Sequence, residues 1–258
     1  MTETILIIVH QAHSTTGRVG HWLKHNGYTL DIRCPAIGTP LPQNLASYAG
    51  VIVFGGPMSA NDRDPWVSDE IDCVERTLSA NIPYLGICLG AQMLCRALGG
   101  KVAAHPEGEV EIGYYPIQPT KGGFELANGI GAAWPGHVYH WHHEGFDLPK
   151  GTRCLASGNA FPHQAFCVGN SAYGIQFHPE VTHSQEGFQV LKNFVLKIAG
   201  LQPTWTADSF VRQAVQQIRD QVGDQEVVMG ISGGVDSTVA AVLLHQAIGE
   251  RLHGVFVD

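Results

Sequence analysis

Residues 83–92 read Pro-Tyr-Leu-Gly-Ile-Cys-Leu-Gly-Ala-Gln, and this stretch decides the fold of the chain. A short apolar run leads into Gly-x-Cys-x-Gly, and residues 89–98 continue with a helical pattern that ends at two glycines. This order is the nucleophile elbow between a strand and a helix, here with Cys88 in the place of serine. The following helix points its N-terminal N–H groups at the sulfur and favours a thiolate. A buried structural cysteine between packing glycines is the alternative interpretation.

Strands and helices alternate on both sides of this elbow. Strands are expected at residues 4–9, 28–33, 50–54, 83–87 and 172–177, and helices at residues 13–26, 64–81, 89–98 and 186–199. The alternation predicts an α/β fold with a doubly wound, mostly parallel sheet. Between residues 101 and 168, glycines, prolines and short strands indicate a small antiparallel extension or long loops.

The composition is that of a soluble globular protein. The chain has 258 residues, 44% of them hydrophobic, and 15 basic against 23 acidic residues give a net charge of −8. This acidity argues against nucleic acid or a membrane surface as the main partner. No apolar run approaches the roughly 18 residues of a membrane span. The six scattered cysteines and the lack of a signal peptide predict a reduced, cytoplasmic protein.

Two further segments carry polar groups that suit a cysteine nucleophile. Residues 173–181 read Tyr-Gly-Ile-Gln-Phe-His-Pro-Glu-Val, which places His178 just past a core strand and Glu180 two residues later. Histidine can take the thiol proton and later deliver it to a leaving amine, while the glutamate orients the imidazole. A capped strand end with a surface histidine is the alternative.

Residues 54–57, Phe-Gly-Gly-Pro, end another strand with backbone N–H groups that can face an anion. With the N–H of Leu89, that of Gly56 would form an oxyanion hole. By itself a Gly-Gly-Pro tripeptide is more often a plain turn.

In order and spacing, these three motifs resemble the class I glutamine amidotransferase family over residues 1–200. The resemblance implies a flavodoxin-like sheet and a reaction in which Cys88 attacks the side-chain amide of glutamine and forms a γ-glutamyl thioester. It also implies His178 as the acid–base group, Glu180 as its orienting partner and Gln92 as a contact to the substrate.

Residues 137–143, His-Val-Tyr-His-Trp-His-His, hold four histidines. A metal site is one interpretation. The segment reads as a loop, and no carboxylate or cysteine follows at ligand spacing, so no metal is expected. The resembling family has a glutamine-binding loop about here, which makes Trp141 and His142 candidates for that role. Cys95 is expected to be a core residue.

After a linker at residues 200–204, a new unit begins, with helices at 208–221 and 236–248 and strands at 226–231 and 252–257. We therefore expect one domain at residues 1–200 and a partial α/β domain at residues 201–258. Its loop 231–238, Ile-Ser-Gly-Gly-Val-Asp-Ser-Thr, lets backbone N–H groups approach an anion closely. A glycine-rich strand–helix turn is the alternative.

This loop resembles the pyrophosphate loop of the N-type ATP pyrophosphatases. The resemblance implies ATP as a ligand and a role for Asp236 in placing Mg²⁺. The ATP-binding residues that it implies are Ser232, Gly233, Gly234, Val235, Asp236, Ser237 and Thr238.

The order of the two units resembles the GMP synthase family, which implies glutamine, ATP and XMP as substrates and GMP as the product. Two features depart from that pattern. Residues 7–13, Ile-Ile-Val-His-Gln-Ala-His, lack the family's Asp-Phe-Gly-Ser-Gln type of opening, and the chain ends at Asp258, before the dimerising domain, so no oligomer is expected. A stand-alone amidotransferase or γ-glutamyl hydrolase is the second interpretation. A regulatory binding module is the third, and the intact Cys-His-Glu set counts against it.

Overall fold

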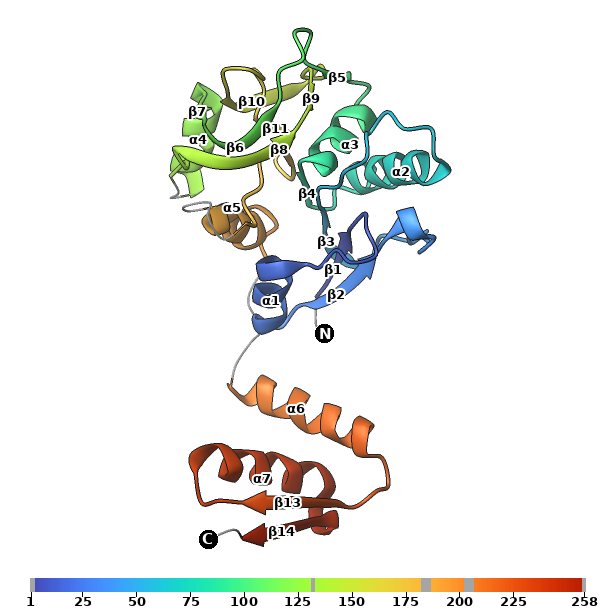
Figure 1. Cartoon of the computed structure of the whole chain (residues 1–258), viewed down its shortest axis with the longest axis vertical. Coiled ribbons are helices and arrows are strands. Elements are labelled where there is room, and N and C mark those ends of the chain that lie inside the picture. The colour runs from blue at the N-terminus through green and yellow to red at the C-terminus, as the bar shows by residue number, and fades with distance from the viewer. Residues whose placement is uncertain (1–2, 131–132, 182–186, 202–206, 257–258) are drawn as a thin grey trace. The chain divides into compact units, whose positions relative to one another are not determined.

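The computed structural model of the chain describes residues 3–130, 133–181, 187–201 and 207–256. The chain forms two compact units, residues 1–203 and residues 204–258 (Figure 1). The division lies three residues beyond the predicted boundary. The predicted linker at 200–204 falls largely outside the described residues.

The first unit is built on a sheet that has eight strands among the described residues. Its first five strands in spatial order are parallel, and the last three are antiparallel, which confirms the mostly parallel sheet with an antiparallel extension. In spatial order the strands are β2 (Thr29–Arg33), β1 (Thr4–Ile8), β3 (Tyr48–Val53), β4 (Tyr84–Ile87), β12 (Ala172–Ile175), β11 (Ala165–Val168), β10 (Thr152–Ser157) and β7 (Gln118–Pro119).

Helices cover both faces of this sheet, as its apolar strands require. In β1, Ile5 and Ile7 belong to the core on one face, and Leu6 and Ile8 belong to the core on the other. The first face is covered by α1 (Gly17–His25), α4 (Lys121–Ile130), α5 (Gly187–Asn193) and the π-helical turn Phe194–Ile198. The second face is covered by α2 (Pro65–Ser79) and α3 (Leu89–Ala97).

Three expectations about local structure are corrected. Helix α4 lies between residues 101 and 168, where only short strands and loops are expected. The two small antiparallel sheets of this region agree with the expected extension, and they pair β5 (Val102–Ala104) with β9 (Glu144–Phe146) and β6 (Glu111–Pro116) with β8 (His137–His142). The histidine-rich segment is therefore strand β8 and not a loop. Along β8 the side chains alternate between the two faces, so His140 and His142 both point inward while His137 is exposed. The inward partner of His140 and His142 comes from β6, which local sequence does not reveal. Helix α1 begins at Gly17, later than residue 13, because Gly17 itself has a φ of +48°.

The second unit consists, within its described residues, of α6 (Ala207–Val222), β13 (Val227–Ile231), α7 (Val235–Ile248), a short 3₁₀ turn at Gly249–Arg251 and β14 (Leu252–Phe256). A similar 3₁₀ turn lies at Pro35–Ile37 in the first unit. The two strands are parallel. The buried core is small and centres on Val215, Ala247 and Ile248.

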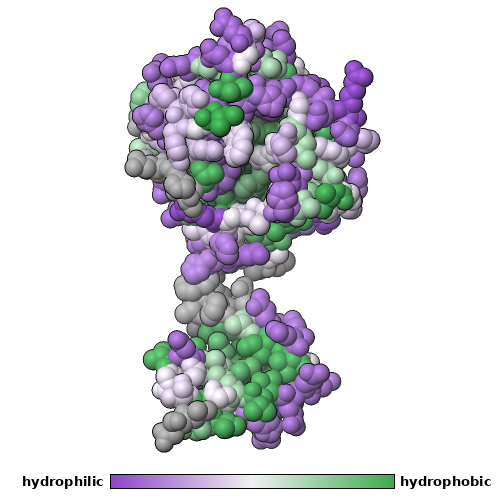
Figure 2. Space-filling model, viewed as in Figure 1, coloured by the Kyte–Doolittle hydropathy of each residue, from purple (hydrophilic) through white to green (hydrophobic). Residues whose placement is uncertain are grey.

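Much apolar surface of the second unit stays exposed, including Val228, Val255 and Phe256 of the strands and Val239 and Val242 of α7. Figure 2 shows it as a broad hydrophobic area on residues 207–256.

None of the helices in the described ranges combines the length and apolarity that a bilayer span requires. All six cysteines lie within these ranges and are free thiols. Cys95 is fully buried, as expected of a core residue, and burial raises its pKa to about 12.

A first prediction concerns the close packing of α3 on β3. A Cβ atom at Gly90 would lie 2.3 Å from the carbonyl oxygen of Val53, and both groups belong to buried backbone. We expect Gly90→Ala to lower the free energy of unfolding by about 1–3 kcal/mol or more. The control is Gly136→Ala, where a Cβ meets nothing within 4 Å. Urea unfolding followed by circular dichroism gives both values, and equal midpoints for the two variants would contradict the packing argument.

Candidate active site

Cys88 sits on the turn between β4 and α3 in a strained backbone conformation. Its φ is +52° and its ψ is −105°, a combination that residues other than glycine rarely adopt. A Cβ at Gly86 would lie 2.3 Å from the carbonyl oxygen of Gly90, so a side chain at Gly86 would collide with the turn. Both glycines of Gly-x-Cys-x-Gly are thus required because a side chain at either position would collide with nearby backbone, as the elbow pattern predicts.

Strand β12 brings His178 to the same edge of the sheet. β12 lies beside β4 with Ile175 opposite Ile87, and the N–H of Cys88 donates to the carbonyl oxygen of Ile175 at 2.8 Å. The chain continues to His178, whose own N–H donates to the carbonyl oxygen of Tyr139 at 2.8 Å. Cys88 and His178 are therefore brought together by neighbouring parallel strands that end at one edge.

His178 is held as a positively charged imidazolium between two partners. Its Nδ1 donates to Oε1 of Glu180 at 2.7 Å. Burial alone lowers the pKa of His178, but hydrogen bonds with Cys88 and Glu180 and the charge of Glu180 outweigh it and raise the pKa to about 10. At neutral pH the ring thus carries a proton that it can give to a leaving group. The three predicted catalytic side chains are in contact in sequence order, Cys88 to His178 to Glu180.

The glycines of residues 54–57 lie directly against this group. A Cβ at Gly55 would be 2.9 Å from Cε1 of His178 and 3.3 Å from Cβ of Cys88. A Cβ at Gly56 would be 2.8 Å from Cβ of His10 and 3.1 Å from Cδ2 of Leu89. The peptide that joins Gly55 and Gly56 is therefore packed between His10 and the catalytic pair, beside Leu89.

His10 and Glu70 form a fully buried ion pair behind this peptide. Nε2 of His10 is 3.0 Å from Oε1 of Glu70, and its Nδ1 is 3.1 Å from the carbonyl oxygen of Gly55. Both partners are acceptors, so both ring nitrogens donate and the ring is an imidazolium. Burial lowers the pKa of His10, but the charge and hydrogen bond of Glu70 outweigh this effect and leave the pKa raised.

This pair orients the peptide between Gly55 and Gly56. In a trans peptide the carbonyl of one residue and the N–H of the next point in opposite directions. Because His10 binds the carbonyl of Gly55, it sets the direction of the N–H of Gly56. Sequence reasoning missed this role, and its only signal was the departure at residues 7–13 from the opening of GMP synthases.

A cavity of about 400 Å³ opens in front of Cys88, within the range of about 300–1,000 Å³ that is common for small-molecule sites. Of the predicted site residues, it brings together the nucleophile, its base, one oxyanion-hole glycine and all three glutamine-binding candidates. The side chains and backbone that line it include Cys88, His178, Gly56, Gln92, Trp141 and His142.

Two glutamines connect the cavity wall to the sulfur. Nε2 of Gln92 donates to the carbonyl oxygen of Glu144 at 3.0 Å and to Oε1 of Gln176 at 3.3 Å. Nε2 of Gln176 in turn lies 3.6 Å from Sγ of Cys88. The sequence does not predict this contact of Gln176, and the position of Gln176 inside the 173–181 motif is the signal that points to it.

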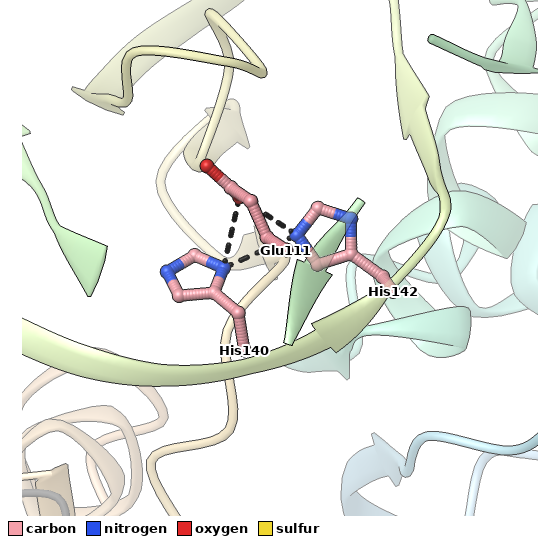
Figure 3. Close-up of side chains that lie close together, drawn as sticks. All are labelled: Glu111, His140 and His142. Carbon is pink, nitrogen blue, oxygen red and sulfur yellow. Dashed lines mark hydrogen bonds and ion pairs between the residues drawn. The ribbon is translucent and has the colours of Figure 1, made fainter. Parts of the chain in front are cut away.

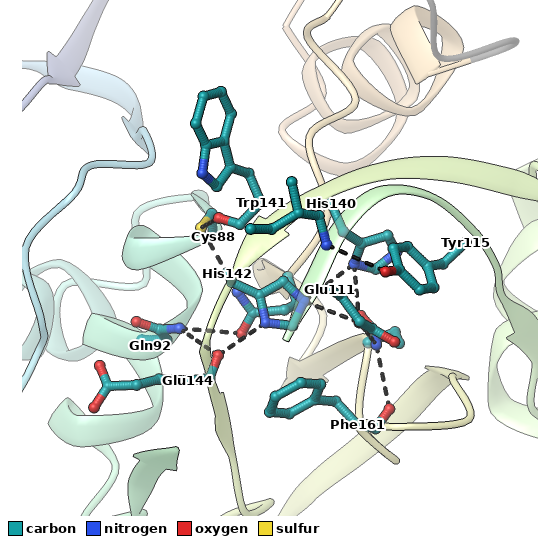
Figure 4. Close-up of polar contacts among 12 residues, drawn as sticks. Cys88, Gln92, Glu111, Tyr115, His140, Trp141, His142, Glu144 and Phe161 are labelled. Atoms are coloured by element: carbon teal, nitrogen blue, oxygen red, sulfur yellow. Dashed lines mark hydrogen bonds and ion pairs between the residues drawn. The ribbon is translucent and has the colours of Figure 1, made fainter. Parts of the chain in front are cut away.

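Trp141 and His142 reach the site by their backbone more than by their side chains. The carbonyl oxygen of Trp141 lies 3.9 Å from Sγ of Cys88, while its indole is 65% exposed (Figure 4). The ring of His142 turns the other way, with Nδ1 on the carbonyl oxygen of Glu144 and Nε2 on Glu111, at 3.0 Å each. Both ring nitrogens of His142 are already bound to Glu144 and Glu111, so only the backbone of His142 is left to contact a substrate.

The predicted phosphate loop lies in the second unit, between β13 and α7. Gly233 has a φ of +74°, and the hydroxyls of Ser237 and Thr238 donate to the carbonyl oxygen of Gly234 at 3.0 and 2.8 Å. Asp236 stands in the first turn of α7. The loop is exposed and presents small residues at a helix N-terminus, an arrangement that suits an anion.

Fold and site together define an α/β protein with a cysteine on an elbow between strand and helix and a His–Glu pair at the end of the neighbouring strand. The chain belongs to the class-I glutamine amidotransferase family, whose sequence model matches residues 13–198. Residues 206–257 match the NAD synthase family model.

Among curated proteins the chain is similar to GMP synthases (glutamine-hydrolyzing). That of Phenylobacterium zucineum is 42% identical over 213 residues, and that of Chromobacterium violaceum is 39% identical over 215 residues. Each alignment covers 81% of this chain and 39% of the relative, so the chain spans about two fifths of the length of these relatives.

Solved structures share the fold. A glutamine amidotransferase from Thermotoga maritima matches with a TM-score of 0.64 and 26% identity, over 83% of this chain and 92% of that one. A glutamine amidotransferase from Methylobacillus flagellatus matches with a TM-score of 0.65 and 22% identity, over 92% of this chain and 80% of that one.

A second prediction concerns the buried pair. His10→Leu leaves the Glu70 carboxylate buried without its partner and is expected to cost about 3–5 kcal/mol of stability. The double variant His10→Leu/Glu70→Leu is expected to recover most of this loss, because no charge stays buried. The pKa of His10 is raised above its ordinary 6.5, so the pair stabilises the fold fully below about pH 6.5 and loses this effect as the pH rises through the raised value.

The measurement is urea unfolding of the wild type and of both variants between pH 6 and pH 10. A double variant as unstable as His10→Leu would mean that side-chain volume, and not the unpaired charge, decides the loss.

Proposed function

We propose that the first unit hydrolyses the side-chain amide of glutamine to glutamate and ammonia. The observation that carries the proposal is the contact of Cys88, His178 and Glu180 at the mouth of a cavity beside Gly56. Membership of the class-I glutamine amidotransferase family supports it. Free cysteines throughout the chain suit a reducing compartment, and we propose a cytoplasmic location on that ground.

The first half of the reaction uses the proton of His178. The thiolate of Cys88 attacks the side-chain carbonyl carbon of glutamine, and a carbon–sulfur bond forms while the carbonyl oxygen becomes negative. His178 gives its proton to the amide nitrogen, the carbon–nitrogen bond breaks and ammonia leaves. The product on the enzyme is a γ-glutamyl thioester.

In the second half His178, now neutral, removes a proton from water, and the resulting hydroxide attacks the thioester. The thiolate of Cys88 leaves and glutamate is released. The N–H groups of Gly56 and Leu89 are proposed to stabilise the oxyanion in both halves, since Gly56 lines the cavity in front of Cys88 and Leu89 follows Cys88 in the chain. Glu180 keeps the imidazole in the required orientation through its bond to Nδ1.

Substrate binding is assigned to the cavity wall. We propose that Gln92, Trp141 and His142 contact glutamine, Trp141 and His142 through backbone groups of β8. The bonds of Gln92 to Glu144 and Gln176 make that wall rigid.

For the second unit we propose that the loop from Ser232 to Thr238 holds the pyrophosphate part of ATP, with Asp236 near Mg²⁺. The small residues and the helix N-terminus at this loop fit such a group. The similarity to GMP synthases suggests that ammonia from the first unit aminates XMP to GMP in a protein that has the full length of these relatives.

A stand-alone amidotransferase or γ-glutamyl hydrolase with another acceptor is the second candidate. Two observations favour it. Residues 7–13 lack the opening that is usual in GMP synthases, and the match to the Thermotoga maritima glutamine amidotransferase covers 92% of that chain.

One chimera separates the two candidates. Residues 1–203 replace the corresponding part of the Phenylobacterium zucineum GMP synthase, and GMP is measured with glutamine or with ammonium as nitrogen source. If the first candidate holds, the chimera forms GMP from both sources and a Cys88→Ala chimera only from ammonium. A chimera that uses ammonium alone, although the unit still hydrolyses glutamine, would point to another acceptor.

A third prediction identifies the nucleophile. Cys88→Ala is expected to abolish glutamate release from glutamine, because no thioester can form. Cys95→Ala is the control, since Cys95 is a buried thiol seven residues further on, and it should keep most of the activity. An unchanged rate in Cys88→Ala would exclude the proposed mechanism.

A fourth prediction separates the two partners of the thiol. His178→Ala is expected to slow thioester formation about 10²–10⁴-fold, since the proton donor is lost. Glu180→Gln should have a smaller effect, because the amide still offers an oxygen to Nδ1 and only the negative charge is lost. Stopped-flow measurement of ammonia release gives both rates. Near-wild-type rates in both variants would show that residues 178–180 only cap the strand.

A further inference from the structure

Three buried side chains that the proposed reaction does not use converge behind the cavity wall. Glu111 comes from β6, and His140 and His142 come from β8 (Figure 3). Strand pairing explains the convergence, because Glu111 lies opposite His142, and His140 is two residues away on the same face. Their exposed fractions are only 2%, 0% and 5%.

One atom of each side chain points to a common centre. Oε2 of Glu111 lies 3.0 Å from Nε2 of His142 and 3.2 Å from Nδ1 of His140, and the two nitrogens are 3.1 Å apart. A metal ion about 2.0–2.1 Å from each atom would lie about 1 Å out of their plane, with ligand angles of about 100°. That is the geometry of three ligands on one side of a zinc-type centre.

The hydrogen atoms available do not satisfy this arrangement as well as a metal does. Nδ1 of His142 faces the carbonyl oxygen of Glu144, which only accepts, so its hydrogen is there. If only one of the three inner atoms (Oε2 of Glu111, Nδ1 of His140 and Nε2 of His142) carries a proton, the other two face each other with lone pairs. Protons on both inner nitrogens place two N–H groups 3.1 Å apart. A divalent cation uses all three lone pairs at once.

A second observation comes from atoms around the cluster. Within the described residues, five buried side-chain atoms have no hydrogen-bond partner, and two of them are Nε2 of His140 and Oε1 of Gln164. Nε2 of the same Gln164 donates to Oε2 of Glu111 at 2.8 Å. Buried polar atoms without partners commonly mark a bound water or ion. Nε2 of His140 lies on the far side of its ring from the common centre, but Oε1 of Gln164 belongs to the side chain that already binds Glu111. Gln164 therefore keeps an acceptor for a water that completes a metal's coordination.

We propose that Glu111, His140 and His142 bind a divalent transition metal of the Zn²⁺ type. Two imidazoles and one carboxylate suit zinc, cobalt, nickel or iron, whereas magnesium and calcium prefer oxygen ligands alone. The bond from His142 Nδ1 to the carbonyl of Glu144 is the outer contact that orients a metal-bound histidine. The site lies outside the proposed reaction and does not rest on it.

The metal links strands β6 and β8 to each other. β8 also carries Trp141, whose carbonyl oxygen faces the sulfur of Cys88. Because the ligands are buried, the ion binds as these strands fold or when they open. Its role is to hold the cavity wall in place.

The test uses the full chain in a Cys88→Ala background, so that the catalytic thiol does not bind the metal. The untagged protein is treated with chelator, dialysed against micromolar Zn²⁺ or Co²⁺, and assayed for bound metal and for the visible absorption of Co²⁺. We expect one metal per chain, a cobalt spectrum of nitrogen and oxygen ligands, and a melting temperature raised by Zn²⁺ by about 3 °C or more.

Two variants locate the site. His140→Gln, which keeps a polar side chain, should lose stoichiometric binding and the shift in melting temperature. His143→Gln is the matched control, because His143 is an exposed histidine outside the cluster, and it should keep the metal. Equal metal content in His140→Gln and its parent would overturn the proposal. So would less than about 0.1 metal per chain in the parent itself, a result that requires no variant to fold.

Discussion

The close approach of backbone at the β4–α3 turn is the constraint on which the first unit depends. Cys88 holds a φ of +52°, a conformation that costs on the order of 1–3 kcal/mol and persists only where the surroundings enforce it. Here Gly86 and Gly90 allow the turn and α3 to touch the backbone of β3. The sulfur consequently stands at the end of the sheet and at the start of a helix, where a negative charge is stabilised.

The rest of the site is attached to this turn by backbone bonds. The N–H of Cys88 donates to β12, and the N–H of His178 donates to Tyr139 of β8, so Cys88, His178 and the cavity wall are connected through the main chain. On the opposite side, His10 and Glu70 hold the Gly55 carbonyl from the core. The geometry around Cys88 thus depends in part on buried groups, such as His10 and Glu70, that do not line the cavity.

The two units differ in how completely they bury their apolar residues. The first has helices on both faces of its sheet, whereas the described part of the second has a two-stranded sheet and exposes residues such as Val228 and Phe256. The first unit thus has a cavity beside Cys88 that is lined by residues from several elements. The loop from Ser232 to Thr238 of the second is formed locally, by one strand, one turn and one helix.

The sequence by itself determined the alternation of strands and helices, the elbow at Cys88 and the pairing of His178 with Glu180, because these depend on residues that are close in the chain. Only the tertiary structure decided which distant groups meet. His10 and Glu70 are 60 residues apart, and Gln176 reaches Cys88 across 88 residues. The histidine-rich segment shows the physical reason most clearly. His140 and His142 became buried partners of Glu111 only because β6 pairs with β8, and no local pattern encodes that register.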